Sequence, residues 1–278
     1  MFSRIAVHLD NGVDCARRLD VGLSLAKAHD AHLTGIFASY MLPGYFYDAA
    51  GLWVRSIDMA REMNTRGRAA VQAAFTQAAL DAGVAVSWRQ GDDAPAECAA
   101  RHARCSDVLI ISQKNAYDLY AATGNNFVEQ TVLTAGRPVI VLPSVGTFPN
   151  IGTRVLYCWD RGREAARALA DAAPLLRNAR ALRVLIGTPD ADADPEASAP
   201  FEDLAAYCAC HGFPQPEQES RSTHDTGIGD AILSAAADFN ADLIVMGAYG
   251  HSRMHEWVLG GATRSLLTAM TMPVLFSH

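Results

Sequence analysis

The sequence predicts an α/β fold of two tandem doubly wound units, each built on a mainly parallel sheet of about five strands. Three observations support this prediction. The chain contains an internal repeat, short apolar segments alternate with helical segments in both copies, and several of the short segments are apolar at every position. Strands that alternate with helices and are apolar throughout are typical of a parallel sheet that helices cover on both faces.

The internal repeat is visible when the two halves of the chain are aligned directly. Residues 5–20, IAVHLDNGVDCARRLD, align without a gap on residues 155–170, VLYCWDRGREAARALA, at an offset of 150. Two later pairs of segments align at an offset of 135: residues 105–112 with 240–247, and residues 137–143 with 272–278. The offsets differ by 15 residues (150 minus 135), which were lost from the middle of the second copy or gained in the first.

Each copy opens with a short apolar strand that ends in an aspartate. A helix follows, with apolar residues near three- and four-residue spacing, as at Leu19, Leu23 and Ala26 in the first copy. A second apolar run then predicts another strand, at residues 33–38 in the first copy and 183–187 in the second. The two copies therefore begin with the same strand, helix and strand.

The two copies differ in the middle. The first continues through an aromatic loop at residues 38–53, ASYMLPGYFYDAAGLW, into a long helix near 56–82. The second has a linker of Pro, Asp and Ala at residues 188–200 and a short helix from about 201 to 211. Both then return to one order of elements, with polar strands at 84–90 and 216–222, helices at 94–103 and 229–239, an apolar fourth strand, a helix, and a last strand opened by proline.

The boundary between the copies is predicted from residues 144–153, SVGTFPNIGT, which have the glycine, proline and polar content of a linker. We therefore expect two domains, at residues 1–146 and 152–278.

Composition limits the classes of function. The chain is 50% hydrophobic and 19% charged, as expected of a globular protein with a substantial core. The N-terminal residues lack the pattern of a secretory signal and no run of apolar residues is long enough for a membrane helix, so we expect a cytoplasmic protein. A formal net charge of −7 argues against nucleic acid or an anionic membrane as partner. The six cysteines form no C-x-x-C pair, which fits reduced thiols.

A candidate binding site lies in the second copy. In open parallel sheets, ligands bind beyond the carboxyl ends of the strands, where the strand order reverses. Asp160 follows the first strand of this copy and Gly247 ends its fourth. A carboxylate can accept hydrogen bonds from an amine or hydroxyl, and glycines let backbone amides approach phosphate oxygens. The alternative is that Asp160 only caps the next helix and that Gly247 and Gly250 only turn the chain.

The glycine tract of the second copy carries a resemblance to a known family. Two residues separate Gly247 from Gly250, and nine separate Gly250 from Gly260. Together with the duplicated strand, Asp and Gly, this spacing resembles the universal stress protein family in its tandem two-domain form, over nearly all of both halves. The family's nucleotide motif is glycine, two residues, glycine, nine residues, glycine, then Ser or Thr. The resemblance implies an adenine nucleotide alpha hydrolase-like sheet in each unit, and units paired across their last strands as an internal pseudo-dimer.

The resemblance also implies a site for an adenine nucleotide, ATP with Mg²⁺, because some members of the family bind one. Asp160 would approach the adenosine moiety, and Ile186 or Gly187 would line the base pocket. The other residues assigned to the site, several of them around the phosphates, are Met246, Gly247, Gly250, Arg253, Gly260, Gly261 and Thr263. One residue departs from the motif: Gly261 stands where Ser or Thr is expected. This removes a hydroxyl that Thr263 would only partly replace.

The first copy departs further from the motif. At the offset of 135, its residues Ser112, Asn115 and Asn125 correspond to the three glycines. Side chains at these positions would obstruct a phosphate, so the loop is interpreted as degenerate, and Asp10 is expected to cap a helix.

The sequence favours binding over catalysis. It contains no G-x-x-x-x-G-K-[ST] stretch, and its only lysines, Lys27 and Lys114, lie in the first copy. Arg253, His251 or Mg²⁺ would have to neutralise the phosphate charge. We therefore expect a stress-response protein that binds or senses a nucleotide and has at most slow ATP hydrolysis. Its expected partners are an unknown protein or a second copy of the chain, in a homodimer. Two alternatives stay open: a ligandless interaction module, and a slow nucleotide hydrolase.

Three further features were weighed as sites. His251 and His255 have the spacing of metal ligands on one helical face, but no carboxylate or cysteine completes the set, so no metal is predicted. The tract of Cys208, Cys210 and His211 likewise offers too few ligands. The aromatic loop from Tyr40 to Trp53 is interpreted as core packing, with a lid or partner surface as the alternative.

Overall fold

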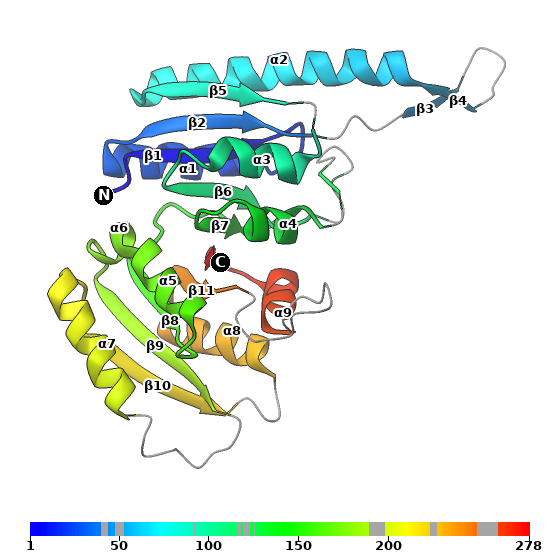
Figure 1. Cartoon of the computed structure of the whole chain (residues 1–278). Helices are drawn as coiled ribbons and strands as arrows, with labels where there is room; N and C mark the ends of the chain where they lie inside the picture. The colour runs from blue at the N-terminus through cyan, green and yellow to red at the C-terminus, as the bar shows by residue number, and fades with distance from the viewer. Residues whose placement is uncertain are drawn as a thin grey trace. The chain divides into compact units, whose positions relative to one another are not determined.

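The computed structural model describes residues 1–39, 44–47, 53–91, 93–115, 118, 123–124, 126–188, 198–222, 227–248 and 261–278. The chain forms two compact units, each with its own strands and helices (Figure 1). One unit consists of residues 2–110 and 114–134, and the other of Met1 with residues 111–113 and 135–278.

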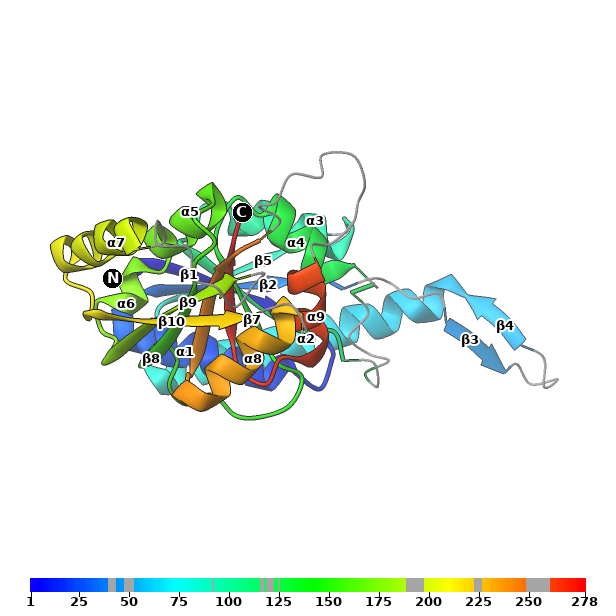
Figure 2. The same ribbon diagram turned by 90° about the horizontal axis from the view of Figure 1, so that it is seen from below.

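The unit formed by the first copy contains parallel strands in the order β6-β1-β2-β5. They are β1 (Arg4–Leu9), β2 (His32–Phe37), β5 (Val86–Gln90) and β6 (Val108–Ser112). The helices are α1 (Cys15–His29), α2 (Ile57–Ala82), α3 (Pro95–Ala103) and α4 (Phe127–Thr134). Helices α1 and α2 cover one face of these strands, and α3 and α4 cover the other (Figure 2). The long helix predicted near residues 56–82 is confirmed.

The aromatic segment of this unit differs from its prediction. Its described part is an antiparallel hairpin of β3 (Gly44–Tyr47) and β4 (Trp53–Ser56), in which Tyr47 pairs with Trp53. The hairpin precedes α2 directly and pairs in a small sheet of its own (Figure 1). A loop was expected here, but aromatic and β-branched residues, such as Tyr45, Phe46 and Val54, favour strands. The packing of the aromatic side chains between Tyr40 and Trp53 lies outside the described residues.

The unit formed by the second copy contains five parallel strands in the order β10-β9-β8-β11-β12. They are β8 (Arg154–Cys158), β9 (Ala181–Thr188), β10 (Pro216–Ser222), β11 (Leu243–Gly247) and β12 (Val274–Ser277). The helices are α5 (Arg163–Asp171), α6 (Ala173–Leu176), α7 (Ser198–His211), α8 (Ile228–Phe239) and α9 (Gly261–Ala269). Helix α5 packs on β11 and β12, and α8 packs on β8 and β9 from the other side (Figure 2).

A sixth strand, β7 (Val139–Leu142), lies next to β12. It is the last strand of the first copy, and it pairs antiparallel with β12, the last strand of the second, with Leu275 opposite Ile140. The predicted fold class is confirmed, including the pairing of the two last strands. The boundary between residues 146 and 152 stays a prediction.

The burial of each strand follows from its sequence. The apolar strands β1 and β11 are buried over almost their whole length, as strands covered on both faces must be. Strand β10 is different: it ends the strand order beside β9 and is mostly exposed. An edge strand with charged residues resists pairing with other chains. The sequence PEQESRS is therefore polar because of where the strand lies.

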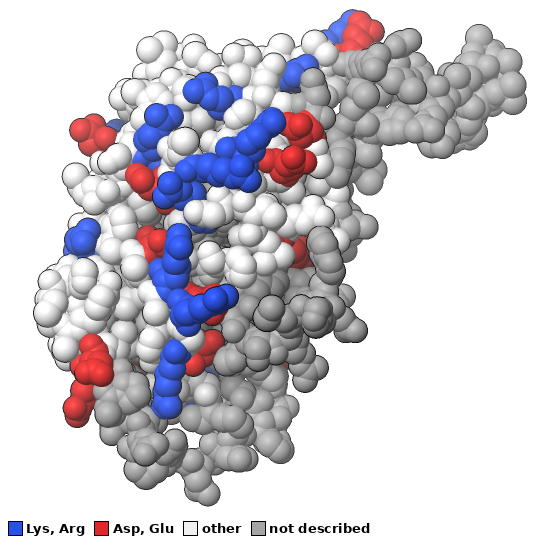
Figure 3. Space-filling view, viewed as in Figure 1, with Lys and Arg blue, Asp and Glu red and all other residues white. Residues whose placement is uncertain are grey.

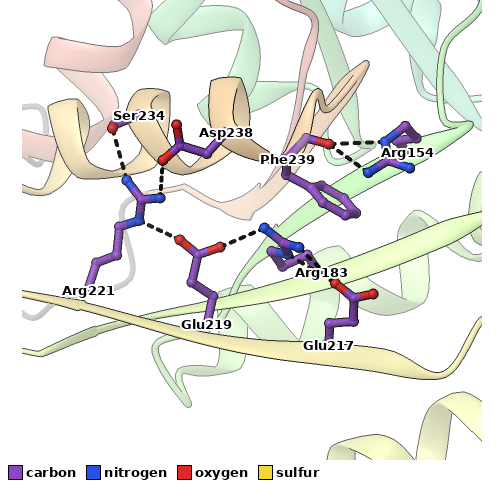
Figure 4. A network of polar contacts seen from close by, with 8 residues as sticks. All are labelled: Arg154, Arg183, Glu217, Glu219, Arg221, Ser234, Asp238 and Phe239. Carbon is purple, nitrogen blue, oxygen red and sulfur yellow. Dashed lines mark hydrogen bonds and ion pairs between the residues drawn. The ribbon is translucent and has the colours of Figure 1, made fainter.

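The charged residues of β10 are held in a network over α8 (Figure 4). Arg221 bridges Glu219 on its own strand and Asp238 on α8, and Glu219 in turn accepts from Arg183 on β9. The guanidinium carbons of Arg154 and Arg183 lie 4.4 and 4.2 Å from the centre of the Phe239 ring. These contacts fix the edge of the sheet through ion pairs and cation–π stacking.

The strand order of the second unit sets the position of a site. The chain runs from β8 to β9 and β10 on one side, then returns to β11 and β12 on the other. The order therefore reverses between β8 and β11, which is where open α/β sheets bind ligands. No helix in the described part of the chain is long and apolar enough to cross a membrane.

Candidate functional site

Asp160 lies in the loop between β8 and α5, at the predicted edge of the second sheet. Its Oδ1 accepts a hydrogen bond of 2.8 Å from the backbone N–H of Gly162, and its side chain is exposed. Between them, Arg161 has a φ of 65°, in the left-handed region. The N-cap of α5 is Gly162, for which no side-chain cap is found among the described residues. Asp160 therefore fixes the turn before the helix and does not cap the helix itself.

Two apolar side chains lie near the same edge. Ile186 on β9 and Met246 on β11 are both buried, and Gly187 follows Ile186 at an exposed position. Because β9 and β11 flank β8 as parallel neighbours, the ends of all three strands meet at one edge of the sheet. The structure thus brings the residues predicted to hold adenosine to the edge where Asp160 lies.

Gly247 has a packing role of its own. A Cβ at this position would lie 2.6 Å from the backbone N of Ala165 and from the backbone C of Glu164, at the start of α5. Any side chain would push the helix off the strand. Close packing of α5 is enough to explain the glycine at this position. A glycine here also leaves the backbone at the end of β11 uncovered by a side chain of its own, as the phosphate-binding interpretation requires.

A buried carboxylate stands beside Gly247. Glu164, in the first turn of α5, is 5% exposed and forms an ion pair with the exposed Arg163. Burial alone would raise the pKa of Glu164, but its hydrogen bond from Arg163 and the nearby charges hold that pKa below its ordinary value. Glu164 is therefore ionised at neutral pH, and its charge is paired with Arg163.

The other residues predicted around the phosphates are only partly described. Gly261 is the first residue of α9, as expected for a helix start. Thr263 lies in the first turn of α9 and is 3% exposed, so its hydroxyl is buried in the unit. The positions of Gly250, Arg253, Gly260, His251 and His255 lie outside the described residues.

The tract on α7 is not arranged as a metal site. Cys208 is buried and Cys210 is exposed, so the two thiols point to different sides of the helix. The ring of His211 stacks on Tyr207, with 4.1 Å between centroids. No group of three or more His, Cys, Asp or Glu residues that could hold a metal ion occurs within the described ranges.

The equivalent site of the first copy is occupied by the protein's own side chains. Asp10 accepts a hydrogen bond of 2.9 Å from the N–H of Gly12, and so makes the same turn as Asp160. Here, however, Asp10 is 1% exposed and lies 2.5 Å from Nη2 of Arg18, which is 2% exposed. Nε of Arg18 also donates to the carbonyl of His8, at 2.7 Å. The expectation that Asp10 caps a helix is wrong: it fixes a turn and pairs with an arginine, and the N-cap of α1 is Asp14.

The charges of this cluster are set by burial and by one another. Burial alone would raise the pKa of Asp10, but Arg18 and the other donors hold that pKa below its ordinary value. Burial lowers the pKa of His8 to about 4, although Asp10 opposes this shift. Neutral His8 donates from Nε2 to the carbonyl of Ala38, at 2.7 Å. The cluster therefore contains one buried ion pair and one neutral imidazole at neutral pH.

The surroundings of Asp10 close the site further. Asp118 lies in the loop that replaces the glycine tract. Its carboxylate accepts a hydrogen bond of 2.7 Å from the N–H of Val13, which precedes α1. Asn115, which stands where Gly250 is in the second copy, donates to Asp14 at 3.2 Å. Asn11 packs against Gly67 of α2, where a Cβ would lie 2.5 Å from its Oδ1. The degenerate loop thus contacts the start of α1.

Sequence reasoning missed the residue that distinguishes the two sites. Arg18 aligns with Ala168 in the gap-free part of the repeat, so the exchange was visible, but its meaning required the contact with Asp10. Trp159 was also missed. Its Nε1 is buried without a hydrogen-bond partner in the described structure, beside Asp160 in the chain. A buried N–H without a partner is rare in folded proteins.

Comparisons with known proteins agree with this architecture. Residues 153–278 match the family model described as the universal stress protein family. Universal stress protein Slr1230 of Synechocystis is 29% identical over 173 residues, which are 61% of this chain and 57% of that protein, so the match spans little more than half the length of this relative.

Two solved structures share the fold over nearly the whole chain. The first is a universal stress protein from Archaeoglobus fulgidus, with a TM-score of 0.74, 17% identity, and 99% of this chain and 95% of that chain covered. The second is a putative universal stress protein from Pseudomonas aeruginosa, with a TM-score of 0.64, 18% identity, and coverage of 99% and 93%. At these identities, the likeness establishes the tandem fold.

Proposed function

We propose that this chain, which belongs to the universal stress protein family through residues 153–278, binds an adenine nucleotide at the carboxyl edge of its second sheet. The ligand proposed is ATP with Mg²⁺, bound by the second copy only, in a cytoplasmic protein that senses or stores the nucleotide and hydrolyses it slowly or not at all.

One observation carries the proposal. Asp160 and Asp10 are held by the same turn, but Asp160 is exposed at the point where the strand order reverses, whereas Asp10 is covered by Arg18. An exposed carboxylate at this position can accept hydrogen bonds from the hydroxyl or amine groups of a nucleoside. The buried side chains of Ile186 and Met246 supply apolar surface at the same edge.

The charges of the site favour a nucleotide bound together with a cation. The backbone and Cβ of Glu164, whose carboxylate pairs with Arg163, pack against Gly247, where the first part of the glycine motif begins. A phosphate near this residue is repelled unless a positive charge stands between them. Mg²⁺ would supply that charge and orient the phosphates, with Arg253 as the second candidate.

The residues of the site favour binding of a nucleotide over its hydrolysis. The second copy contains no lysine to bridge phosphates. The interaction module without a ligand is the second candidate, because close packing of α5 explains Gly247 without any nucleotide.

Calorimetric titration of ATP and Mg²⁺ into the purified full chain tests the proposal. We expect one nucleotide per chain, and a loss of affinity of about tenfold or more in Asp160→Asn, which keeps an acceptor for the Gly162 turn but removes the charge. Asp203→Asn, at an exposed position on α7, is the matched control and is expected to bind as the wild type does.

Three results separate this proposal from its rivals. Gly250→Val is expected to abolish binding if the glycine tract holds the phosphates. Absence of heat at millimolar nucleotide in the wild type would favour the interaction module. Steady release of phosphate, lost in Asp160→Asn, would favour the hydrolase.

A further inference from the structure

The buried cluster of the first copy has the arrangement of a binding site with its ligand in place. The acceptors of the Arg18 guanidinium include the Oδ1 of Asp10 at 2.5 Å and the carbonyl of His8 at 2.7 Å. Asp10, His8 and Arg18 are each no more than 2% exposed. A charged pair removed from water to this degree needs good geometry and hydrogen bonds from its surroundings, and the cluster has both.

Both acceptors are positioned by groups other than Arg18. The Asp10 carboxylate is held by the N–H of Gly12, and the ring of His8 is held by the carbonyl of Ala38. The carbonyl of His8 belongs to β1, which pairs with β2 on one side and β6 on the other. The acceptors therefore keep their places if the arginine side chain is removed.

The second copy shows the same turn without the arginine. Ala168 stands at the position of Arg18 and is fully buried, and Asp160 is exposed. The neighbouring strand positions carry larger residues, since Tyr157 and Trp159 align with Val7 and Leu9, and the Tyr157 hydroxyl donates to the carbonyl of Ala165 on α5. Because Ala168 is fully buried, an arginine placed there would have to displace its neighbours, so the exchange is best tested in the first copy.

We propose that Arg18 is a built-in ligand, and that Asp10 and the carbonyl of His8 form a subsite that binds a free guanidinium compound once the Arg18 side chain is absent. A planar cation with several N–H donors matches two fixed acceptors better than an ammonium ion does. The subsite is independent of the nucleotide proposed for the second unit, because the first copy lacks the glycines of the motif.

Chemical rescue of Arg18→Ala tests this assignment in the full chain. The variant leaves the Asp10 carboxylate buried without its cation, so its melting temperature is expected to fall well below that of the wild type. Methylguanidinium at low millimolar concentration is expected to raise that melting temperature saturably, by on the order of 5 °C. Methylammonium at the same ionic strength is expected to give a smaller rise, and the wild type no rise.

Two variants make the test specific. Arg17→Ala removes an arginine one position away that pairs with Asp14 at 2.8 Å, and it is expected to show no response to methylguanidinium. In Arg18→Ala combined with Asp10→Asn, the buried charge is gone, so the response should disappear. A response that persists in the double variant, or equal rises with methylguanidinium and methylammonium, would overturn the proposal.

If Arg18→Ala does not fold alone, its recovery from urea provides the readout. Refolding to a soluble, cooperatively melting protein with methylguanidinium and not with methylammonium supports the subsite. Equal failure with both cations, while the double variant refolds, would show that the cavity does not take a guanidinium group.

Discussion

The two copies of this chain make the same turn after their first strands and use it differently. In both, an aspartate Oδ1 accepts from the N–H of a glycine two residues later, at 2.9 Å for Asp10 and 2.8 Å for Asp160. The first carboxylate is covered by Arg18, whereas the second is exposed beside Ala168. The turn itself therefore does not determine whether a ligand can bind. The residue eight positions after the aspartate, on the next helix, decides whether the carboxylate is exposed to a ligand.

Beyond this turn, the copies differ at both ends of the site. The first copy has lost the glycine spacing, and its loop contacts the start of α1 through Asp118 and Asn115. The second has kept the spacing and the close approach of α5 to Gly247. In a duplicated fold, side chains of the protein itself can thus fill one of the two sites. The aspartate of that site is then retained as a buried structural residue.

The largest expected effect is a difference in stability between two variants, each of which lacks one of the two aspartates. Asp10→Ala leaves the Arg18 guanidinium buried without its partner, and we expect the free energy of unfolding to fall by about 3–5 kcal/mol. Asp160→Ala removes one hydrogen bond at an exposed turn, so a loss of about 1 kcal/mol or less is expected. Urea denaturation measures both, with Trp88 reporting on the first unit and Trp159 on the second.

That contrast depends on Arg18 being the partner that matters. Asp10→Ala combined with Arg18→Met removes both charges and should recover much of the lost stability. Equal losses for Asp10→Ala and Asp160→Ala would contradict the difference in burial between the two turns.

A second difference concerns pH. The unfolded chain protonates His8 near its ordinary pKa of 6.5, but burial lowers the pKa in the folded chain to about 4. Between these values the unfolded state binds the additional proton, so stability falls as the pH is lowered from 6.5 towards 4, by about 3 kcal/mol in total. Cys158 holds this position in the second copy, and burial raises the pKa of its thiol to about 12, so it contributes no such dependence.

The pH effect is measured by urea denaturation of the wild type and of His8→Gln at pH 7, 5.5 and 4. We expect the variant to be less stable than the wild type at pH 7, because the fit of the ring is lost, but to lose less stability on acidification. His211→Gln, on α7, is the control. Parallel pH profiles for the wild type and His8→Gln would assign the acid sensitivity to other groups.

The sequence was sufficient for the fold because its signals are local and repeated. Apolar strands such as β11, the helix at Ile57–Ala82 and the offsets between the copies each predict an element or an order of elements, and all of these are found. The hairpin of β3 and β4 was not predicted because it has no counterpart in the second copy. Its pairing joins residues such as Phe46 and Val54, which are eight positions apart, and is not part of the repeated pattern.

The candidate site was less predictable, because its properties arise from contacts distant in sequence. Asp160 and Gly247 were found from their places at strand ends, but the helix start that requires a glycine at 247 was not. The exchange of Arg18 for Ala168 is plain in the alignment, yet only the folded chain shows that Arg18 reaches Asp10. A long side chain in a sequence does not reveal which carboxylate it neutralises.

The smallest expected effect tests the second site alone. The acids Asp14 and Glu164 occupy the same position in the two copies, but Asp14 is engaged by Arg17 and Asn115, whereas Glu164 pairs with the exposed Arg163 and packs against Gly247. If phosphate binds there, as proposed, Glu164→Gln removes a repulsion, and ATP affinity should rise threefold to tenfold, on the order expected for one partly screened charge.

The gain in ATP affinity of Glu164→Gln should be larger at low Mg²⁺, where no divalent ion shields the Glu164 carboxylate from the phosphates. Glu202→Gln, at an exposed position on α7, is the matched control for the change of net charge and should leave the affinity unchanged. Titration calorimetry at two Mg²⁺ concentrations gives the comparison. Weaker binding in Glu164→Gln would mean that the carboxylate supports the nucleotide, as a ligand of the bound cation, and the site would then be one that recognises Mg²⁺ and nucleotide together.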